Sequence, residues 1–224
     1  MESTVENIME VMRELNVSVT THGRVLVEDA AATGPVRLLV GFHGYAQNAD
    51  EMLAMMRGIP GSGWTLASIQ ALHRFYRGRS ETTVASWMTR QDRDLAIADN
   101  VAYIDAALAS VAEGRVIERL VFVGFSQGVA MAFRAAVLGA RRADAVLALG
   151  GDVPPDVLAS GAVSVPRVLL ARGTRDEYYT ADKLRADQTA LSSRGASVET
   201  LTFDGGHEWH VDFAGRATGV LSSL

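Results

Sequence analysis

RLVFVGFSQG, residues 119–128, leads an apolar run into a serine that stands between two glycines. Residues 121–123 are apolar without alternation, which is typical of a strand buried on both faces. Residues 129–138 have apolar positions at helical spacing, so the backbone must turn sharply at Ser126. A serine on such a turn is expected to present its hydroxyl at the carboxyl edge of a sheet, as a nucleophile requires. The alternative is a glycine-rich turn with a capping serine.

Apolar runs alternate with helical patterns on both sides of this stretch. Strands are predicted at residues 17–21, 24–28, 36–42, 65–69, 120–123, 145–149, 168–171 and 198–203, the first two as a pair joined near residues 22–23. Helices are predicted at residues 49–56, 95–111, 129–138, 181–193 and, in the tail, 210–224. This alternation predicts an α/β fold with a mostly parallel central sheet and helices on both faces. Right-handed crossovers would bring the carboxyl ends of the strands to one edge.

The composition limits the classes of protein that the chain can represent. With 224 residues, 48% of them hydrophobic, residues 1–224 are expected to form a single domain around one core. The formal net charge of −5 gives no general electrostatic reason to expect nucleic acid as a partner. The chain has no cysteine, which excludes disulfides, thiolate metal ligands and a cysteine nucleophile.

The start of the chain, residues 1–15, is acidic and amphipathic and lacks the basic beginning and apolar middle of a signal peptide. No apolar run is expected to reach the length of a membrane helix. We therefore expect a soluble, cytoplasmic protein without stable membrane insertion. A homodimer is compatible with the sequence, because edge helices in such folds often expose apolar surface.

A serine hydroxyl is a poor nucleophile near neutral pH and needs a base and a third group that orients the base. In hydrolases with this turn the chain order is serine, acid, histidine. Two histidines follow Ser126, namely His207 and His210. His207 is the preferred base because it follows the last predicted strand on a Gly-Gly loop, whereas His210 begins a helical segment.

The acid is sought among the carboxylates that follow predicted strands. Asp176 follows the strand at residues 168–171 and could accept a hydrogen bond from His207. Asp152, just past the preceding strand, is its rival. Asp204 is too close to His207 along the chain, and Glu177 is expected to be a solvated neighbour. The structural alternative for Asp176 is a loop or helix-capping aspartate.

The oxyanion formed when serine attacks a carbonyl needs two preorganised N–H donors. One is expected from Gln127, the residue after the serine, and the other from the loop that follows the strand at residues 36–42. Gly44 allows that loop to approach closely, and the Tyr45 N–H is the expected second donor. His43 is interpreted as a structural residue that bonds this loop. The histidines match no metal-binding motif, so no metal is expected.

Four segments together resemble the α/β-hydrolase superfamily, and within it the phospholipase/carboxylesterase family that includes acyl-protein thioesterases. They are Phe42-His43-Gly44, Gly124-Phe125-Ser126-Gln127-Gly128, Gly173-Thr174-Arg175-Asp176 and Gly206-His207, in the family's order. The resemblance implies a catalytic triad of Ser126, Asp176 and His207, an acyl-enzyme intermediate and no cofactor.

Two departures from the family pattern fall where substrate would sit. Ser86-Trp87-Met88 resembles the family's Ser-Trp-aromatic-Asp segment at the acyl site, but Met88 and Thr89 replace the aromatic residue and the acid. After His43-Gly44, Tyr-Ala-Gln replaces the usual Leu-Gly-Asp. The resemblance implies that His43, Gly44, Trp87 and Met88 border the substrate, while the departures leave its identity open.

Residues 73–94 form the longest stretch predicted to be irregular, and we expect this loop near the active site. It holds five arginines and three aromatic residues. Arg74, Arg77 and Arg79 would form a rim for an anionic group, or else a solvated loop with one or two ion pairs.

The sequence as a whole predicts a serine hydrolase that cleaves a small-molecule ester or thioester through an acyl-enzyme. A binding protein of the same fold, which turns its ligand over slowly or never, is the alternative. Cofactor-free perhydrolysis would use the same residues and is separable only by assay.

Overall fold

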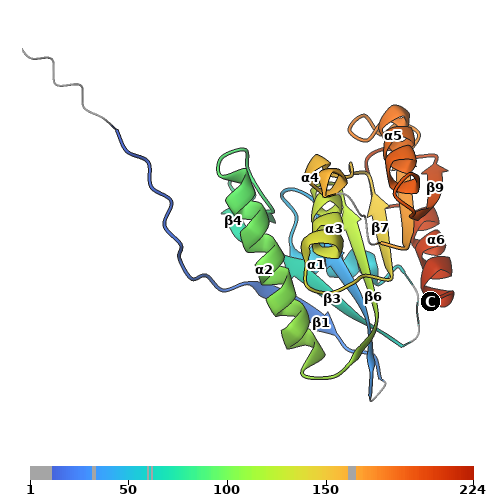
Figure 1. Cartoon of the computed structure of the whole chain (residues 1–224), viewed down its shortest axis with the longest axis horizontal. Coiled ribbons are helices and arrows are strands. Elements are labelled where there is room, and N and C mark those ends of the chain that lie inside the picture. The colour runs from blue at the N-terminus through green and yellow to red at the C-terminus, as the bar shows by residue number, and fades with distance from the viewer. Residues whose placement is uncertain (1–11, 32–33, 60, 62, 161–164) are drawn as a thin grey trace, which may run out of the picture.

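A twisted sheet of seven strands forms the centre of the computed structural model, which describes residues 12–31, 34–59, 61, 63–160 and 165–224 (Figure 1). The strand order is β1-β3-β2-β6-β7-β8-β9. Only β1 runs antiparallel to its neighbour, so the predicted α/β fold with a mostly parallel sheet is confirmed. The strands are β1 (Arg24–Glu28), β2 (Val36–Phe42), β3 (Trp64–Gln70), β6 (Ile117–Phe125), β7 (Ala145–Leu149), β8 (Arg167–Gly173) and β9 (Ser197–Phe203).

Helices cover both faces of the sheet, because successive side chains of each strand point to opposite sides. In β6, Phe122 packs into the core beneath one set of helices, while Val121 and Val123 belong to the core on the other face. The first set comprises α2 (Arg93–Ala112), α3 (Gln127–Leu138), α4 (Pro155–Ala159) and α5 (Ala181–Ser192). The second set comprises α1 (Ala49–Met56) and α6 (Val211–Ser222).

The beginning of the chain differs from its prediction. Residues 12–23 form no strand and run away from the body with exposed side chains (Figure 1), so the expected pair of strands 17–21 and 24–28 is wrong. Val17 and Val19 are each more than three-quarters exposed, because no neighbouring strand receives them. β1 pairs instead with β3. The acidic amphipathic start, up to residue 11, lies outside the described residues.

The stretch at 73–94 is not irregular throughout, which corrects the sequence prediction. β4 (His73–Tyr76) and β5 (Thr83–Ser86) pair as an antiparallel hairpin outside the main sheet. Their side chains are mostly polar and aromatic, so they lack the apolar run that reveals the buried strands. The short helix α4 was also missed.

By length and composition, α2 could cross a membrane, contrary to the expectation that no segment reaches this length. In the structure, Ile104, Leu108 and Val111 of α2 are buried in the core beside the sheet. Core helices pass the same test of length and composition, and α2 packs on the sheet as such a helix does.

Candidate active site

Ser126 occupies the turn between β6 and α3 with a left-handed backbone, φ 54° and ψ −119°. Two glycines make this turn possible. A Cβ on Gly124 would lie 2.6 Å from the carbonyl oxygen of Gly128, and a Cβ on Gly128 would lie 2.0 Å from that of Phe42. Such distances exclude any side chain at either position. The Gly-x-Ser-x-Gly pattern is therefore a packing requirement of a strained turn that exposes one serine.

A continuous series of hydrogen bonds runs from this serine. Ser126 Oγ lies 2.9 Å from His207 Nε2, and His207 Nδ1 lies 2.9 Å from Asp176 Oδ2. The other oxygen of Asp176 accepts from the backbone N–H groups of Tyr178 and Tyr179, each at 2.9 Å. With Nδ1–H donated to the buried carboxylate, Nε2 is left to accept the serine proton, as a general base requires.

The loops that carry the acid and the histidine are braced against each other. Arg172, at the end of β8, donates from its guanidinium to the carbonyl oxygens of Tyr179 (2.7 Å) and Asp176 (3.2 Å). The Arg175 N–H donates to the carbonyl oxygen of Gly205, in the loop after β9, at 2.9 Å. Backbone bonds between the two loops thus hold the carboxylate and the imidazole in one geometry.

The structure separates His207 from its rival, His210. The His210 side chain caps the N-terminus of α6 by accepting from the Asp212 N–H at 3.2 Å. Its ring stacks on Phe203 with 4.4 Å between the centroids. His210 therefore has a structural role, and the loop position of His207 was the informative signal.

The rival carboxylates have other partners or face solvent. Asp152 forms an ion pair with Lys183 at 3.1 Å, and Asp204 forms one with Arg175. Glu177 is exposed. Of the four acids considered from the sequence, the structure brings Asp176 alone to His207.

The amides expected to hold an oxyanion lie on the loop after β2 and at the start of α3. A Cβ on Gly44 would lie 3.4 Å from the Ser126 Cβ, so this loop passes directly beside the serine. The N–H of Ala46 donates to a backbone carbonyl. The N–H groups of Tyr45 and Gln127 donate to no group within the described parts of the chain, which leaves two donors near the serine.

His43 and Trp87 do not border the substrate site, which corrects that expectation. Both side chains are fully buried and neither lines the cavity next to Ser126. His43 Nε2 accepts from the Ala71 N–H at 3.1 Å, and the Trp87 indole donates to the His43 carbonyl oxygen at 2.8 Å. Burial lowers the pKa of His43 to about 4, so the ring is neutral near pH 7. The two residues support the loop after β2, which agrees with the interpretation of His43 as a structural residue.

A cavity of about 830 Å³ opens beside Ser126. Met88, expected at the substrate, lines it, whereas Gly44 is buried in the loop beneath. Its lining comes from β4 and the segment after β5, from the loop after β7 and from α3.

The side chain of Gln127 has a role that the sequence did not reveal. Its Oε1 accepts from the Trp87 N–H at 3.1 Å, and its Nε2 donates to Ser86 Oγ at 3.1 Å and to the Met88 carbonyl oxygen at 3.3 Å. The residue after the serine therefore fixes the segment that follows β5 against the start of α3.

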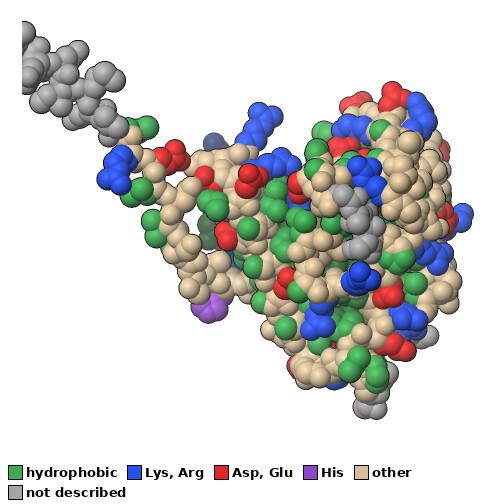
Figure 2. Space-filling view, viewed as in Figure 1, with side chains coloured by type: hydrophobic (Ala, Val, Ile, Leu, Met, Phe, Trp, Pro, Cys, Tyr) green, Lys and Arg blue, Asp and Glu red, His purple; other side chains and the backbone are tan. Residues whose placement is uncertain are grey.

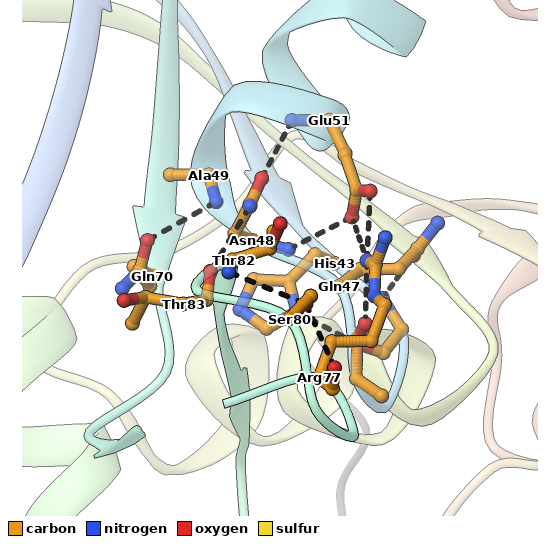
Figure 3. A network of polar contacts seen from close by, with 12 residues as sticks. His43, Gln47, Asn48, Ala49, Glu51, Gln70, Arg77, Ser80, Thr82 and Thr83 are labelled. Carbon is orange, nitrogen blue, oxygen red and sulfur yellow. Dashed lines mark hydrogen bonds and ion pairs between the residues drawn. The ribbon is translucent and has the colours of Figure 1, made fainter. Parts of the chain in front are cut away.

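Arg77 is a structural residue rather than part of a rim. Its guanidinium donates to both Glu51 oxygens, at 2.7 and 2.9 Å, and to the Ala46 carbonyl oxygen at 2.8 Å (Figure 3). Glu51 also accepts from the Asn48 N–H at 3.2 Å, within the capping box that starts α1. Arg77 thus ties the β4–β5 hairpin to α1 and to the loop that carries Tyr45.

The arginines at the cavity are largely different from the three expected. Of the three expected arginines, Arg74 lines the cavity, and Arg77 and Arg79 do not. The other arginines that line it are Arg90, Arg93 and Arg134. Arg134 lies within the apolar pattern of α3, where the sequence gives no sign of which face meets a cavity.

Arg134 is fully buried and forms a bidentate ion pair with Asp156, with N–O distances of 2.8 and 2.7 Å. The hydrogen bonds from Arg134 hold the pKa of Asp156 below its ordinary value, and Arg93 adds to the lowering. Among the described residues, no group of three or more His, Asp or Glu side chains is arranged to hold a metal ion.

Comparisons with known proteins concern the family and the fold. The sequence profile of the Phospholipase/Carboxylesterase family matches residues 83–220. A search of curated protein sequences found no match. Among solved structures, esterase PE8 is 21% identical with a TM-score of 0.72, covering 91% of this chain and all of that one. Acyl-protein thioesterase 2 from Zea mays is 17% identical with a TM-score of 0.69, covering 90% and 99%. A carboxylesterase from Mesorhizobium loti is 20% identical with a TM-score of 0.68, covering 84% and 89%.

Proposed function

We propose that the chain, which belongs to the phospholipase/carboxylesterase family and is a carboxylic ester hydrolase, cleaves small esters or thioesters through an acyl-enzyme on Ser126. The observation that carries the proposal is the pair of 2.9 Å contacts that join Ser126 Oγ to His207 and His207 to Asp176. A hydroxyl, an imidazole and a buried carboxylate in this order are the groups that nucleophilic acyl transfer needs.

In the proposed acylation step, Ser126 Oγ attacks the ester carbonyl carbon while His207 Nε2 takes the hydroxyl proton. Asp176 stabilises the imidazolium and keeps the ring oriented. The N–H groups of Tyr45 and Gln127 hold the oxyanion of the tetrahedral intermediate. Collapse of the intermediate breaks the bond to the leaving alcohol or thiol, which takes the proton from His207.

In the proposed deacylation step, water enters the place of the leaving group. His207 removes a proton from this water as its oxygen attacks the acyl carbon, and the same two N–H groups hold the second oxyanion. The bond to Ser126 Oγ then breaks, Oγ regains a proton from His207, and the carboxylic acid leaves. No cofactor is needed in either step.

The substrate class follows from the family and from the size of the cavity. A volume of about 830 Å³ accommodates a small ester beside Ser126. Thioesters are included because the fold is also that of a plant acyl-protein thioesterase and because a thiolate is a good leaving group. A small molecule is therefore the proposed partner at this site.

Replacing the nucleophile tests the proposal. We expect Ser126→Ala to lower the hydrolysis of p-nitrophenyl butyrate by a factor of about 10⁴ or more, because no other hydroxyl takes part. The matched control is Ser110→Ala, which removes an exposed hydroxyl from α2 and should leave the rate within twofold.

Thermal unfolding of both variants shows whether either substitution disturbs the fold. A folded Ser126→Ala variant with wild-type activity would contradict the proposal. A folded wild-type protein that hydrolyses no ester would instead favour a ligand-binding protein of the same fold.

A further inference from the structure

The cavity beside Ser126 has the opposite charge from the molecule as a whole. The chain has a formal net charge of −5, and over the face in Figure 2 basic and acidic side chains are interspersed. Among the described residues that line the cavity, five are cationic and only Asp152 is acidic. The cations are Arg74, Arg90, Arg93, Arg134 and Lys183.

Only part of this positive charge is neutralised locally. Lys183 pairs with Asp152, and Arg134 pairs with Asp156. Arg74 donates to a backbone carbonyl, which leaves its charge in place. Within the described parts of the chain, Arg90 and Arg93 form no ion pair with a carboxylate. The cavity therefore keeps an excess of positive charge.

Arg134, whose charge is paired with Asp156, adds a buried hydrogen-bond donor. Asp156 accepts hydrogen bonds from Nε and Nη2 of Arg134. The other terminal nitrogen, Nη1, contacts only the Met88 sulfur, at 3.3 Å. A thioether is a weak acceptor for a guanidinium N–H. Because Arg134 exposes none of its side chain, a carboxylate oxygen reaches this donor only when the flexible Met88 side chain moves aside. The carboxylate is then the better acceptor, since hydrogen bonds between charged groups are about twice as strong as neutral ones.

The donor is also correctly placed relative to the serine. Ala130 and Arg134 stand four residues apart on one side of α3, and both line the cavity together with Ser126, which precedes the helix. Gln127, the first residue of α3, and Arg134 are separated by about 10 Å along the helix axis. An Arg side chain points back toward the N-terminus of its helix, which brings the guanidinium closer to the serine.

Arg93 stands near the same point. Its positive charge acts on Asp156, the partner of Arg134, so the two guanidinium groups share one neighbourhood around a single carboxylate. Arg93 itself is exposed. One guanidinium is thus buried and the other is exposed to solvent, which is a suitable arrangement for attracting an anion from solution.

We propose that this cavity selects esters that carry a carboxylate a few carbon atoms from the scissile bond, with Arg93 and Arg134 as the specificity-determining residues. The proposal rests on the hydrolytic function proposed above and adds the substrate class. Half-esters of short dicarboxylic acids have this chemistry. The excess positive charge attracts them, and the paired N–H groups of a guanidinium match the two oxygens of a carboxylate.

The test compares two ethyl esters of similar length, monoethyl glutarate and ethyl hexanoate, by titrating the acid released. For the wild-type protein, kcat/KM for the charged ester should be at least tenfold higher than for the neutral one. Arg93→Met, which keeps the side-chain length and removes the charge, should reduce this preference by roughly two- to fivefold, the range for a charge pair at a solvent-exposed side chain.

Arg79→Met is the matched control, because Arg79 is an exposed arginine of the β4–β5 connection that does not line the cavity. Its preference for the charged ester should equal that of the wild type. An equal or lower kcat/KM for monoethyl glutarate, or an unchanged preference in Arg93→Met, overturns the inference. Absence of activity on both esters instead contradicts the proposed function.

Discussion

Two regions meet at the cavity, and they are built differently. The serine edge, meaning the loops that carry Ser126, Asp176 and His207, is held by backbone hydrogen bonds and by glycines that admit no side chain. The cation wall, meaning Arg74, Arg90, Arg93 and Arg134, consists of long side chains of which only Arg134 is buried.

The difference separates two tasks. Proton transfer and nucleophilic attack need groups held within a few tenths of an ångström, and a braced backbone supplies this accuracy. Recognition of a distant charge tolerates a flexible side chain and depends mainly on the local sign of the potential. Substitutions at the serine edge should therefore abolish the reaction, whereas those at the cation wall should change which ester is used.

The largest effect is expected from the two histidines after β9. His207→Ala removes the base and should lower ester hydrolysis by roughly 10³- to 10⁶-fold. His210→Ala removes only the helix cap and the stack on Phe203, so activity should stay within twofold while stability falls by about 1 kcal/mol. Steady-state rates and chemical unfolding of the two variants measure this contrast. Equal loss of activity in both would contradict the assignment.

A second contrast compares two glycines. Gly128→Ala places a Cβ 2.0 Å from the Phe42 carbonyl oxygen, so β2 and α3 must separate, and we expect a loss of about 3 kcal/mol or more in unfolding free energy. Gly215→Ala, in α6, meets no atom within 4 Å and should stabilise the protein by about 0.5–1 kcal/mol. Urea unfolding gives both values. A tolerated Gly128→Ala would show that the turn is not under this constraint.

The smallest effect concerns two carboxylates: Asp156, which pairs with Arg134, and Asp187, which accepts from Tyr179. Arg134 lowers the pKa of Asp156, so its stabilising contribution is present above the unfolded pKa and is lost as the pH falls through the folded value. Burial raises the pKa of Asp187, which accepts from the Val153 N–H and the Tyr179 hydroxyl. Stability should therefore decrease as the pH rises from the unfolded pKa of Asp187 through its folded value.

Asparagine at position 187 can accept the same two hydrogen bonds without a charge. Unfolding free energies measured between pH 3 and pH 8 should show the decrease with rising pH in the wild type and its loss in Asp187→Asn. Asp156→Asn should instead weaken the decrease toward low pH. An unchanged profile in both variants would contradict these directions.

The serine edge was predictable from the sequence because its constraints are local. A buried strand that ends in two glycines around Ser126 leaves few geometries, and the parallel sheet brings the ends of β8 and β9 to the same edge. Asp176 and His207 could then be selected by their positions after those strands. The buried strands were found for the same reason, since their apolar runs are continuous.

The cation wall could not be predicted from the sequence, because the tertiary partners of each arginine decide its role. Arg77 pairs with Glu51, which lies 26 residues away and belongs to another element, whereas Arg93 meets no such carboxylate among the described residues. Trp87 lies in a segment that resembles a substrate-binding motif, yet its ring is buried beneath the loop. Burial of a large side chain depends on neighbours that no short stretch of sequence identifies.

The most direct test of the central claim is covalent labelling of the serine. The protein is treated with a fluorophosphonate and the adduct is located by mass spectrometry of its peptides. We expect one phosphonyl group, on Ser126, with a labelling rate that falls by about 10³-fold or more in His207→Ala. A folded wild-type protein that remains unlabelled, or a label on another residue, would contradict the account.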